Sequence, residues 1–247
     1  MKRWITAVLA AAAGSQVIVA GAILGGSTAK PAAIASAAAI AAAVGWAWPV
    51  AGRRRAVEAE EIVRAAAAQP GRAALAIVRT PEGESLADLS DRGPALLVFV
   101  RHAGCCFCRE AISDLAAARP RLEAAGICTV IVHRSSDQGM RRILERYKIR
   151  NVALVRDSGG RLYRAFGLRR GTSAQIVGPA LWGRGIQAAL LEGHGVAAPE
   201  SDPWQMPGVF LVHRGRILSR FYHRSSADRP DYAAVCASGL QALRQAG

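Results

Sequence analysis

The chain has 247 residues, of which 51% are hydrophobic, and a formal net charge of +14. Apolar residues occur throughout the chain, which excludes a low-complexity disordered protein, and the length suffices for one domain with a proper core. The positive charge does not indicate nucleic-acid binding, because the arginines are scattered and no zinc-finger spacing or RNA-binding aromatic motif occurs. A basic domain held beside an anionic membrane surface accounts for the charge.

The first predicted elements are two helices, in stretches without charged residues at 5–24 and 32–51. At a rise of about 1.5 Å per residue, a helix of this length spans a hydrocarbon core of about 30 Å. The segment 25–31 between them is rich in glycine and small residues and ends in proline, as is typical of a turn. The sequence therefore predicts a membrane-anchoring helical hairpin over residues 1–52 and a helical linker over residues 53–72.

The flanking charges predict the orientation of this hairpin. Lys2 and Arg3 precede the first stretch and three arginines at 53–55 follow the second, whereas the loop between the stretches holds only Lys30. Positive flanks stay in the cytoplasm, so we expect a location in the cell inner membrane with the rest of the chain facing the cytoplasm. Three alternatives stay open: a cleaved signal peptide, a single span that places the domain outside, or buried helices of a soluble protein.

Strand and helix signals alternate along residues 73–247. Short continuous apolar runs predict buried strands, and apolar residues at helical spacing predict helices. The expected order is strand 95–101, helix 107–124, strand 127–133, helix 138–148, strand 152–155, a hairpin of strands 208–213 and 217–222 around Arg214-Gly215, and helix 231–243. The order predicts an α/β protein with a thioredoxin-like fold, in which a central mixed sheet is flanked by helices.

Residues 172–203 form an insert in this scheme. We expect one helix over 174–191 followed by a tail rich in glycine and proline. A segment of this length between core elements is usually functional or a docking surface. Its apolar residues, Trp182 among them, fit either a membrane surface or a cover over the active-site edge of the sheet, and the sequence does not choose between these.

Three of the five cysteines lie together, as Cys105, Cys106 and Cys108, between a predicted strand and a predicted helix. The first turn of a helix has unpaired N–H groups and a partial positive charge, which lower a thiol pKa from about 8.5 into a range of roughly 3.5 to 7.5. A second cysteine three residues on lies one turn away, within reach of a disulfide. We therefore expect Cys105 to be the nucleophile and Cys108 the resolving thiol.

The residues next to the pair are candidates for supporting roles. His102 and Arg101 precede the site and are candidates to add positive charge near the thiolate. Cys106 is a candidate bystander. A metal site of the three thiols with His102 is the rival interpretation, but four ligands within seven residues do not match the paired spacing of structural zinc sites, so we expect neither a metal nor a cofactor. The remaining cysteines, Cys128 and Cys236, are expected in the core.

Three separated segments carry a family resemblance. Residues 96–110 (LLVFVRHAGCCFCRE), 161–167 (RLYRAFG) and 204–213 (WQMPGVFLVH) resemble, in order and spacing, peroxiredoxin-like proteins of the AhpC/TSA family that have a Cys-x-x-Cys motif and are related to the selenoprotein L group. The resemblance covers roughly residues 75–240. It implies reduction of peroxides, a thiol reductant such as a thioredoxin or a small thiol, and a cis peptide bond before Pro207, which would expose the preceding backbone to a substrate.

The chain departs from that pattern at two points. His102 stands where typical peroxiredoxins have threonine or serine, and Gly104 and Cys106-Phe107 stand where thioredoxins have tryptophan and Gly-Pro. Peroxide reduction is thus implied by the family, and dithiol exchange by the motif. We predict a thiol-dependent oxidoreductase that reduces peroxides or disulfides through Cys105 and Cys108. The alternative is a membrane-anchored redox sensor or binding module that uses the same pair without turnover.

Overall fold

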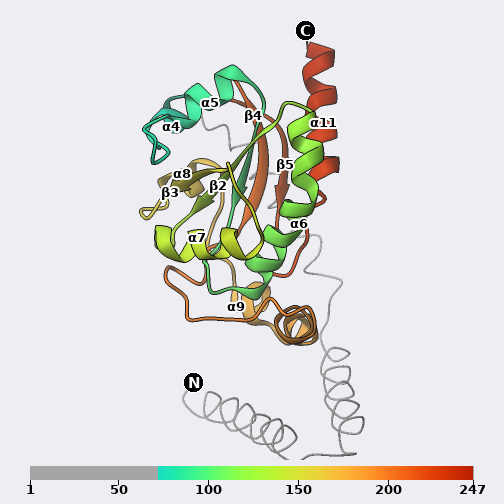
Figure 1. Ribbon diagram of the computed structural model, residues 1–247. Helices are drawn as coiled ribbons and strands as arrows, with labels where there is room; N and C mark the ends of the chain where they lie inside the picture. The colour runs from blue at the N-terminus through green and yellow to red at the C-terminus, as the bar shows by residue number, and fades with distance from the viewer. Residues whose placement is uncertain (1–71, 247) are drawn as a thin grey trace, which may run out of the picture. The chain divides into compact units, whose positions relative to one another are not determined.

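The computed structural model describes residues 72–246 of the chain (Figure 1). The expected hairpin at 1–52 lies outside these residues, and so does the linker at 53–72 except for its last residue. No helix within residues 72–246 combines the length and the apolar character that crossing a membrane requires.

A five-stranded sheet forms the centre of the structure, with strand order β3-β2-β1-β4-β5. Strands β1, β2 and β3 run parallel, and β4 is antiparallel to both β1 and β5. The strands are β1 (Ala95–Phe99), β2 (Cys128–His133), β3 (Ala153–Arg156), β4 (Gly208–His213) and β5 (Arg216–Tyr222). The hairpin turns at Arg214 and Gly215, both with positive φ, as two-residue hairpin loops require. The predicted mixed sheet is confirmed.

Helices cover both faces of the sheet, which explains why β1 is apolar at every position (Figure 1). Leu96 and Val98 pack on one face, and Leu97 and Phe99 on the other, as the alternation of a strand requires. The first face packs against α6 (Cys106–Ala124), α7 (Asp137–Arg146) and α11 (Tyr232–Ala246), and the second against α4 (Arg72–Ala76), α5 (Leu86–Arg92) and α8 (Arg161–Ala165).

The insert is not the single helix that we expected. It consists of four short pieces: α9 (Ser173–Val177), η1 (Pro179–Leu181), α10 (Trp182–Ile186) and the π-helical η2 (Gln187–Leu191). The break falls at Gly178, whose ψ of 153° is extended, because a residue before proline is driven out of the helical region. In Figure 1 the insert lies at the end of the sheet where α6 begins.

The insert both packs on the domain and exposes apolar side chains. Ala188 is fully buried, and η2 contacts α6. More than half of the surface of six large apolar side chains on or just after the insert helices is exposed, those of Val177, Trp182, Ile186, Leu190, Leu191 and Val196. The insert therefore packs against α6, the helix that begins at the cysteine motif, and its exposed apolar side chains leave the membrane-surface role as a prediction.

Candidate active site

The cysteine motif lies at the junction between the loop that follows β1 and the first turn of α6. Strand β1 ends at Phe99 and α6 begins at Cys106, so Cys105 is the N-cap residue and Cys108 lies in the first turn, as predicted. Only 8% of Cys105 and 5% of Cys108 is exposed. Both thiols are buried because the insert lies over the motif.

Cys105 has the properties of a nucleophilic thiolate. Its pKa is lowered to about 6, chiefly by the hydrogen bond from the thiol of Cys108 and then by the positive charge of Arg101, against the opposing effect of burial. The backbone N–H groups of Phe107 and Cys108 lower it further, as the start of a helix should. Cys105 is therefore mainly ionised at neutral pH.

Arg101 supplies the positive charge beside this thiolate. Its Nη1 donates a hydrogen bond to Cys105 Sγ at 3.3 Å, and only 4% of the residue is exposed. Two residues of the insert's tail hold it in place: Nη2 donates to the Pro203 carbonyl, and the Arg101 carbonyl accepts from Ser201 Oγ at 3.4 Å. The sequence indicated Arg101 as a candidate source of positive charge near the thiolate. No sequence pattern predicted its contacts with the insert.

Cys108 is the opposite kind of thiol. Its pKa is raised well above the ordinary value, because its S–H donates a hydrogen bond to Cys105, because it is buried and because Cys105 is negatively charged. The backbone N–H of Arg101 donates to Cys108 Sγ at 3.4 Å. One thiolate and one protonated thiol thus face each other, which is the arrangement that lets a nucleophile form an intermediate and a second thiol resolve it.

His102 lies in the same loop but carries no charge at neutral pH. Burial and the neighbouring cations Arg101 and Arg109 lower its pKa to about 4. Its Nδ1 is buried without a hydrogen-bond partner among residues 72–246, and its carbonyl accepts from the N–H of Cys105 at 3.3 Å. The charge near the thiolate therefore comes from Arg101, and the visible contribution of His102 is to shape the loop.

The loop backbone is fixed from three sides. The Ala103 N–H donates to Ser135 Oγ at 2.9 Å, and the Ala103 carbonyl accepts from Arg109 Nε at 2.9 Å. The Gly104 carbonyl accepts from the N–H of Ala197, in the insert's tail, at 2.9 Å. A side chain at Gly104 would place its Cβ only 2.3 Å from the Ala197 carbonyl oxygen, so the insert can cover the motif this closely only over a glycine.

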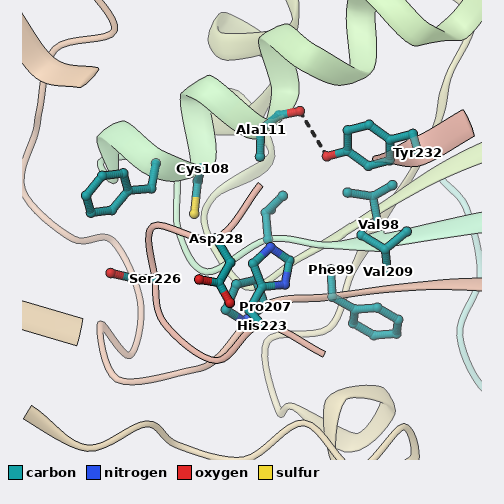
Figure 2. Close-up of a pocket in the computed structure, with 12 residues that line it drawn as sticks. Val98, Phe99, Cys108, Ala111, Pro207, Val209, His223, Ser226, Asp228 and Tyr232 are labelled. Atoms are coloured by element: carbon teal, nitrogen blue, oxygen red, sulfur yellow. Dashed lines mark hydrogen bonds between the residues drawn. The ribbon is translucent and has the colours of Figure 1, made fainter. Parts of the chain in front are cut away.

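Pro207 lies beside the motif, but the expected cis bond is wrong. No cis peptide bond occurs among residues 72–246. The backbone before Pro207 is also engaged, because the Met206 N–H donates to the Arg169 carbonyl at 3.0 Å and the Met206 carbonyl accepts from Gln205 Nε2 at 3.3 Å. Met206 is only 4% exposed, so this backbone is not presented to a substrate. Pro207 does line a small cavity together with Cys108 (Figure 2).

The other three cysteines have raised pKa values, chiefly because of burial. For Cys106 the charge of neighbouring Cys105 adds to the effect. Cys236 is buried and Cys128 is partly buried, each packed in the hydrophobic core. All five thiols are free. Because the pKa values of these three are raised, none of them competes with Cys105 as the ionised nucleophile.

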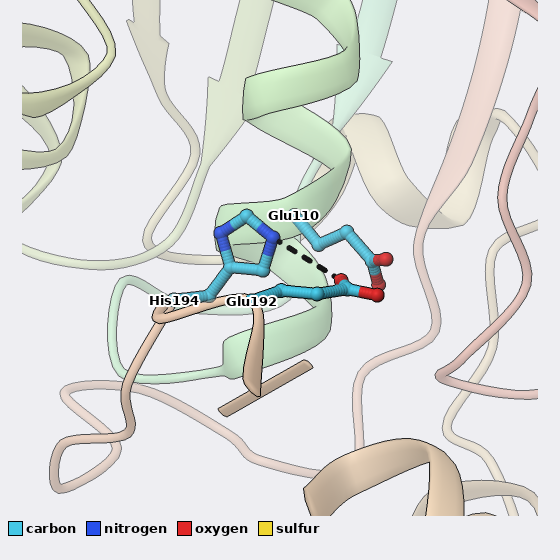
Figure 3. A group of neighbouring side chains, drawn as sticks. All are labelled: Glu110, Glu192 and His194. Carbon is cyan, nitrogen blue, oxygen red and sulfur yellow. Dashed lines mark ion pairs between the residues drawn. The ribbon is translucent and has the colours of Figure 1, made fainter. Parts of the chain in front are cut away.

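One cluster of metal-ligating side chains occurs within residues 72–246, and it does not involve the thiols (Figure 3). Ligand atoms of Glu110, Glu192 and His194 lie within 4.8 Å of one another. Two guanidinium groups, of Arg184 and Arg229, contact the same Glu110 carboxylate oxygen. They supply the positive charge that a metal ion would bring, so the cluster is an ion-pair network that ties the insert to α6.

A comparison with protein-family models finds one family. The model of the AhpC/TSA family matches residues 79–217. No curated protein matches the sequence.

Several solved structures are similar to this one. Peroxidoxin BcpB from Mycobacterium tuberculosis has 16% sequence identity and a TM-score of 0.45 over 68% of this chain and 90% of its own. Peroxiredoxin Q from Xanthomonas campestris has 16% identity and a TM-score of 0.46 over 71% of this chain and 95% of its own. A secreted M. tuberculosis disulfide oxidoreductase homologous to E. coli DsbE has 12% identity and a TM-score of 0.40 over 66% and 93%.

The family match includes β1, the cysteine loop and α6, and extends through β4. It spans more than half of the chain and contains the ionised thiol described above. The chain therefore belongs to the AhpC/TSA family and is a thiol-dependent oxidoreductase.

Proposed function

We propose that the protein is a peroxiredoxin-like oxidoreductase that reduces peroxides or disulfides through the dithiol of Cys105 and Cys108. Cys105 attacks the peroxide oxygen or the disulfide sulfur, and Cys108 then displaces the product to form an intramolecular disulfide. A thioredoxin or a small thiol restores the dithiol. The family membership supports the chemistry, and the Cys-x-x-Cys spacing, as in the selenoprotein L-related members that the sequence resembles, supports the use of two thiols.

One observation carries this proposal. Cys105 has a pKa lowered to about 6 at the start of α6, and its principal hydrogen-bond donor is the thiol of Cys108. A thiolate attacks a peroxide or a disulfide, whereas a thiol does not, and the nearest group able to resolve the product is the donor itself. None of the other cysteines has a lowered pKa.

The test uses the full chain in detergent, with hydrogen peroxide or a small disulfide as substrate and dithiothreitol or a thioredoxin system as reductant. We expect turnover in the wild type, none in Cys105→Ser, and near wild-type turnover in Cys106→Ser, the matched control one residue away. In Cys108→Ser we expect one equivalent of substrate to react and turnover to stop in the absence of a small thiol. Unchanged turnover in Cys105→Ser would exclude the assigned nucleophile.

A redox sensor is the second candidate, and the position of Arg101 favours it. The Arg101 guanidinium binds Cys105 Sγ and the Pro203 carbonyl at once, so it connects the thiolate to the insert's tail. Oxidation of Cys105 removes the negative charge and with it one of these two contacts. A sensor would oxidise once without sustained turnover and would show faster hydrogen exchange at Ala197 after oxidation. An enzyme shows turnover whether or not the insert moves.

We also propose that the N-terminal stretches anchor this domain to the inner membrane with the active site facing the cytoplasm. The two stretches without charged residues and the positive flanks at 2–3 and 53–55 support this proposal. Fractionation of cells that express the full chain, followed by protease treatment of intact spheroplasts, tests it. A protein recovered in the wash, or one cleaved from outside, would contradict the anchor or the orientation respectively.

A further inference from the structure

The proposed dithiol chemistry leaves one proton without a destination. Cys108 must lose its proton to form the disulfide, yet its pKa is raised well above the ordinary value and only 5% of the residue is exposed. Before oxidation Cys105 accepts a hydrogen bond from it, but oxidised Cys105 is no longer an anion. A different base must therefore serve Cys108 during resolution.

The register of the sheet brings a histidine to this place. Phe99 at the end of β1 pairs with Gly208 at the start of β4, and Gly208 pairs with Tyr222 at the end of β5. The next residues beyond this row are Val100, Pro207 and His223, which all line one cavity with Cys108. His223 thus follows β5 at the same end of the sheet as the cysteine motif, although 115 positions separate it from Cys108.

The side chains of Cys108 and His223 line the same cavity (Figure 2). It leaves about 10 Å³ for the centre of a water molecule, close to the room that one bound water needs. Figure 2 shows the side chains of Cys108, His223 and Asp228 around it. His223 Nδ1 is buried without a hydrogen-bond partner in the described part of the chain, so this nitrogen is free to accept a hydrogen bond. Only 7% of His223 is exposed.

The other polar groups near Cys108 are less well placed to act as its base. His102 also has a buried Nδ1 without a partner among the described residues, but His102 does not line this cavity. Arg101 is always a cation. Burial raises the pKa values of the phenols of Tyr163 and Tyr232, so they hold their protons. The carboxylate of Asp228 is occupied, because it already accepts hydrogen bonds from the N–H groups of Arg224 and Ser225 and from Ser225 Oγ.

From this geometry we propose that His223 is the proton acceptor for Cys108, through one water molecule in the cavity, when Cys108 resolves the oxidised state of Cys105. His223 is neutral at pH 7, since burial lowers its pKa to about 4 while Asp228 and the Pro207 backbone act against this and Arg101 adds to it. Because it is neutral, this imidazole can take up a proton, and because its pKa is low it gives the proton up again readily, so it serves as a transient relay.

When the oxidised state is a mixed disulfide between Cys105 and an external thiol, one sulfur–sulfur bond forms as another breaks. The Cys108 proton moves to the water as the water's own proton moves to His223 Nδ1, and Cys108 Sγ forms a bond with Cys105 Sγ. The external thiolate leaves with the electron pair of the broken sulfur–sulfur bond and takes up a proton from solvent, while His223 returns its own. For a sulfenic acid, the leaving hydroxide becomes water in the same way.

The experiment measures attack by Cys105 and resolution by Cys108 as two separate steps. The first step tests the proposed function, on which this inference rests, and the second step tests the role of His223. Dithiobis(nitrobenzoate) reacts with the full chain in a Cys106→Ser, Cys128→Ser background. The first nitrothiobenzoate is released when Cys105 attacks, and the second when Cys108 resolves. With His223→Gln we expect an unchanged first release and a second release slowed about 100-fold, the usual contribution of a general base. The matched control is His133→Gln, at a buried histidine whose pKa is also lowered to about 4 but which does not line the cavity.

Two further readouts separate proton transfer from damage to the fold. In His223→Gln the second release should accelerate about tenfold per pH unit toward the pKa of Cys108, because only hydroxide then removes the proton. In His223→Ala, added imidazole should restore the second release. A second release at the parental rate, or both releases slowed equally, would overturn the role of His223. If Cys105 of the parent chain reacts with neither dithiobis(nitrobenzoate) nor hydrogen peroxide, that is a separate failure, because it would refute nucleophilic Cys105 and both proposals with it.

Discussion

The replacement Arg101→Gln tests whether the thiolate depends on its buried guanidinium. The hydrogen bond from Nη1 to Cys105 Sγ is 3.3 Å long and charge-assisted, and hydrogen bonds of this kind contribute about 1.5–3 kcal/mol. At about 1.4 kcal/mol per pKa unit, its loss should raise the pKa of Cys105 by roughly one to two units. Starting from a pKa of about 6, the new value is roughly 7 to 8. The hydrogen bond from Cys108 remains and keeps the pKa below that of an ordinary thiol.

The assay is the pH dependence of alkylation by iodoacetamide, with Cys105 followed by peptide mass spectrometry. The thiolate fraction at pH 7 should fall from about 90% to between about 50% and 10%, and the rate should recover near pH 9. Arg109→Gln is the control, because this guanidinium binds the carbonyls of Ala103 and His194 and no sulfur. A Cys105 midpoint that stays within about 0.3 units in Arg101→Gln would refute the assignment.

Three further substitutions test the packing at Gly104, the pairing of the two thiols and the burial of His133. Gly104→Ala should lower the free energy of unfolding by about 1–3 kcal/mol in urea titrations, because its Cβ would meet the Ala197 carbonyl oxygen, whereas Gly183→Ala, with no described atom within 4 Å, should be neutral or stabilising. Cys108→Ala should raise the pKa of Cys105, whose largest stabilising contact is lost, and leave a sulfenic acid that dimedone traps after peroxide treatment; recovery of a disulfide would contradict it. The pKa of His133 is lowered to about 4 by burial, so the unfolded chain binds its proton first and stability is lost as pH falls from about 6.5 to 4. That residue adds up to about 1.4 kcal/mol per pH unit to the slope, and an equal slope in His133→Gln would count against it.

The sequence predicted the part of the fold that local patterns encode. The run at 95–101 is apolar at nearly every position because helices cover both faces of the sheet, and such a run is easily identified as a central strand. The start of α6 was predictable because a loop follows that strand and helical periodicity follows the loop. The hairpin was equally clear, since Arg214-Gly215 separates two apolar runs.

The sequence analysis did not predict two short helices whose first turns are stabilised by capping side chains. Helix α5 begins with a capping box of Ser85 and Asp88, a Ser-x-x-Asp signal that was present in the sequence. Helix α8 has only five residues, and the Asp157 carboxylate accepts hydrogen bonds from three of its N–H groups. Neither helix has enough turns for apolar periodicity to be visible in the sequence, so only the residues that cap the first turn indicate where the helices begin.

The parts of the site that the sequence did not predict depend on contacts distant along the chain. Ser201 and Pro203 hold Arg101 from about a hundred positions away, and no local pattern predicts that the insert's tail returns to the loop. The position of His223 was also not predictable from local patterns, because only the sheet register brings it to the same end of the sheet as the cysteine motif. The family resemblance, in turn, predicted a cis bond at Pro207 that the described residues do not have.

The cover over the thiolate limits what can reach it. Cys105 is ionised yet only 8% exposed, and the backbone of Ala197 and Ala198 closes over Gly104. A peroxide is small enough to enter such a site, whereas a folded protein disulfide requires the insert to move first. We therefore expect the second-order rate with Cys105 to fall from hydrogen peroxide through bulky alkyl hydroperoxides, in measurements corrected for intrinsic reactivity with a free thiol. Gly104→Ala, which pushes the cover away, should flatten this dependence. A rate independent of oxidant size in the wild type would show that the insert opens faster than the chemistry, and that burial does not select the substrate.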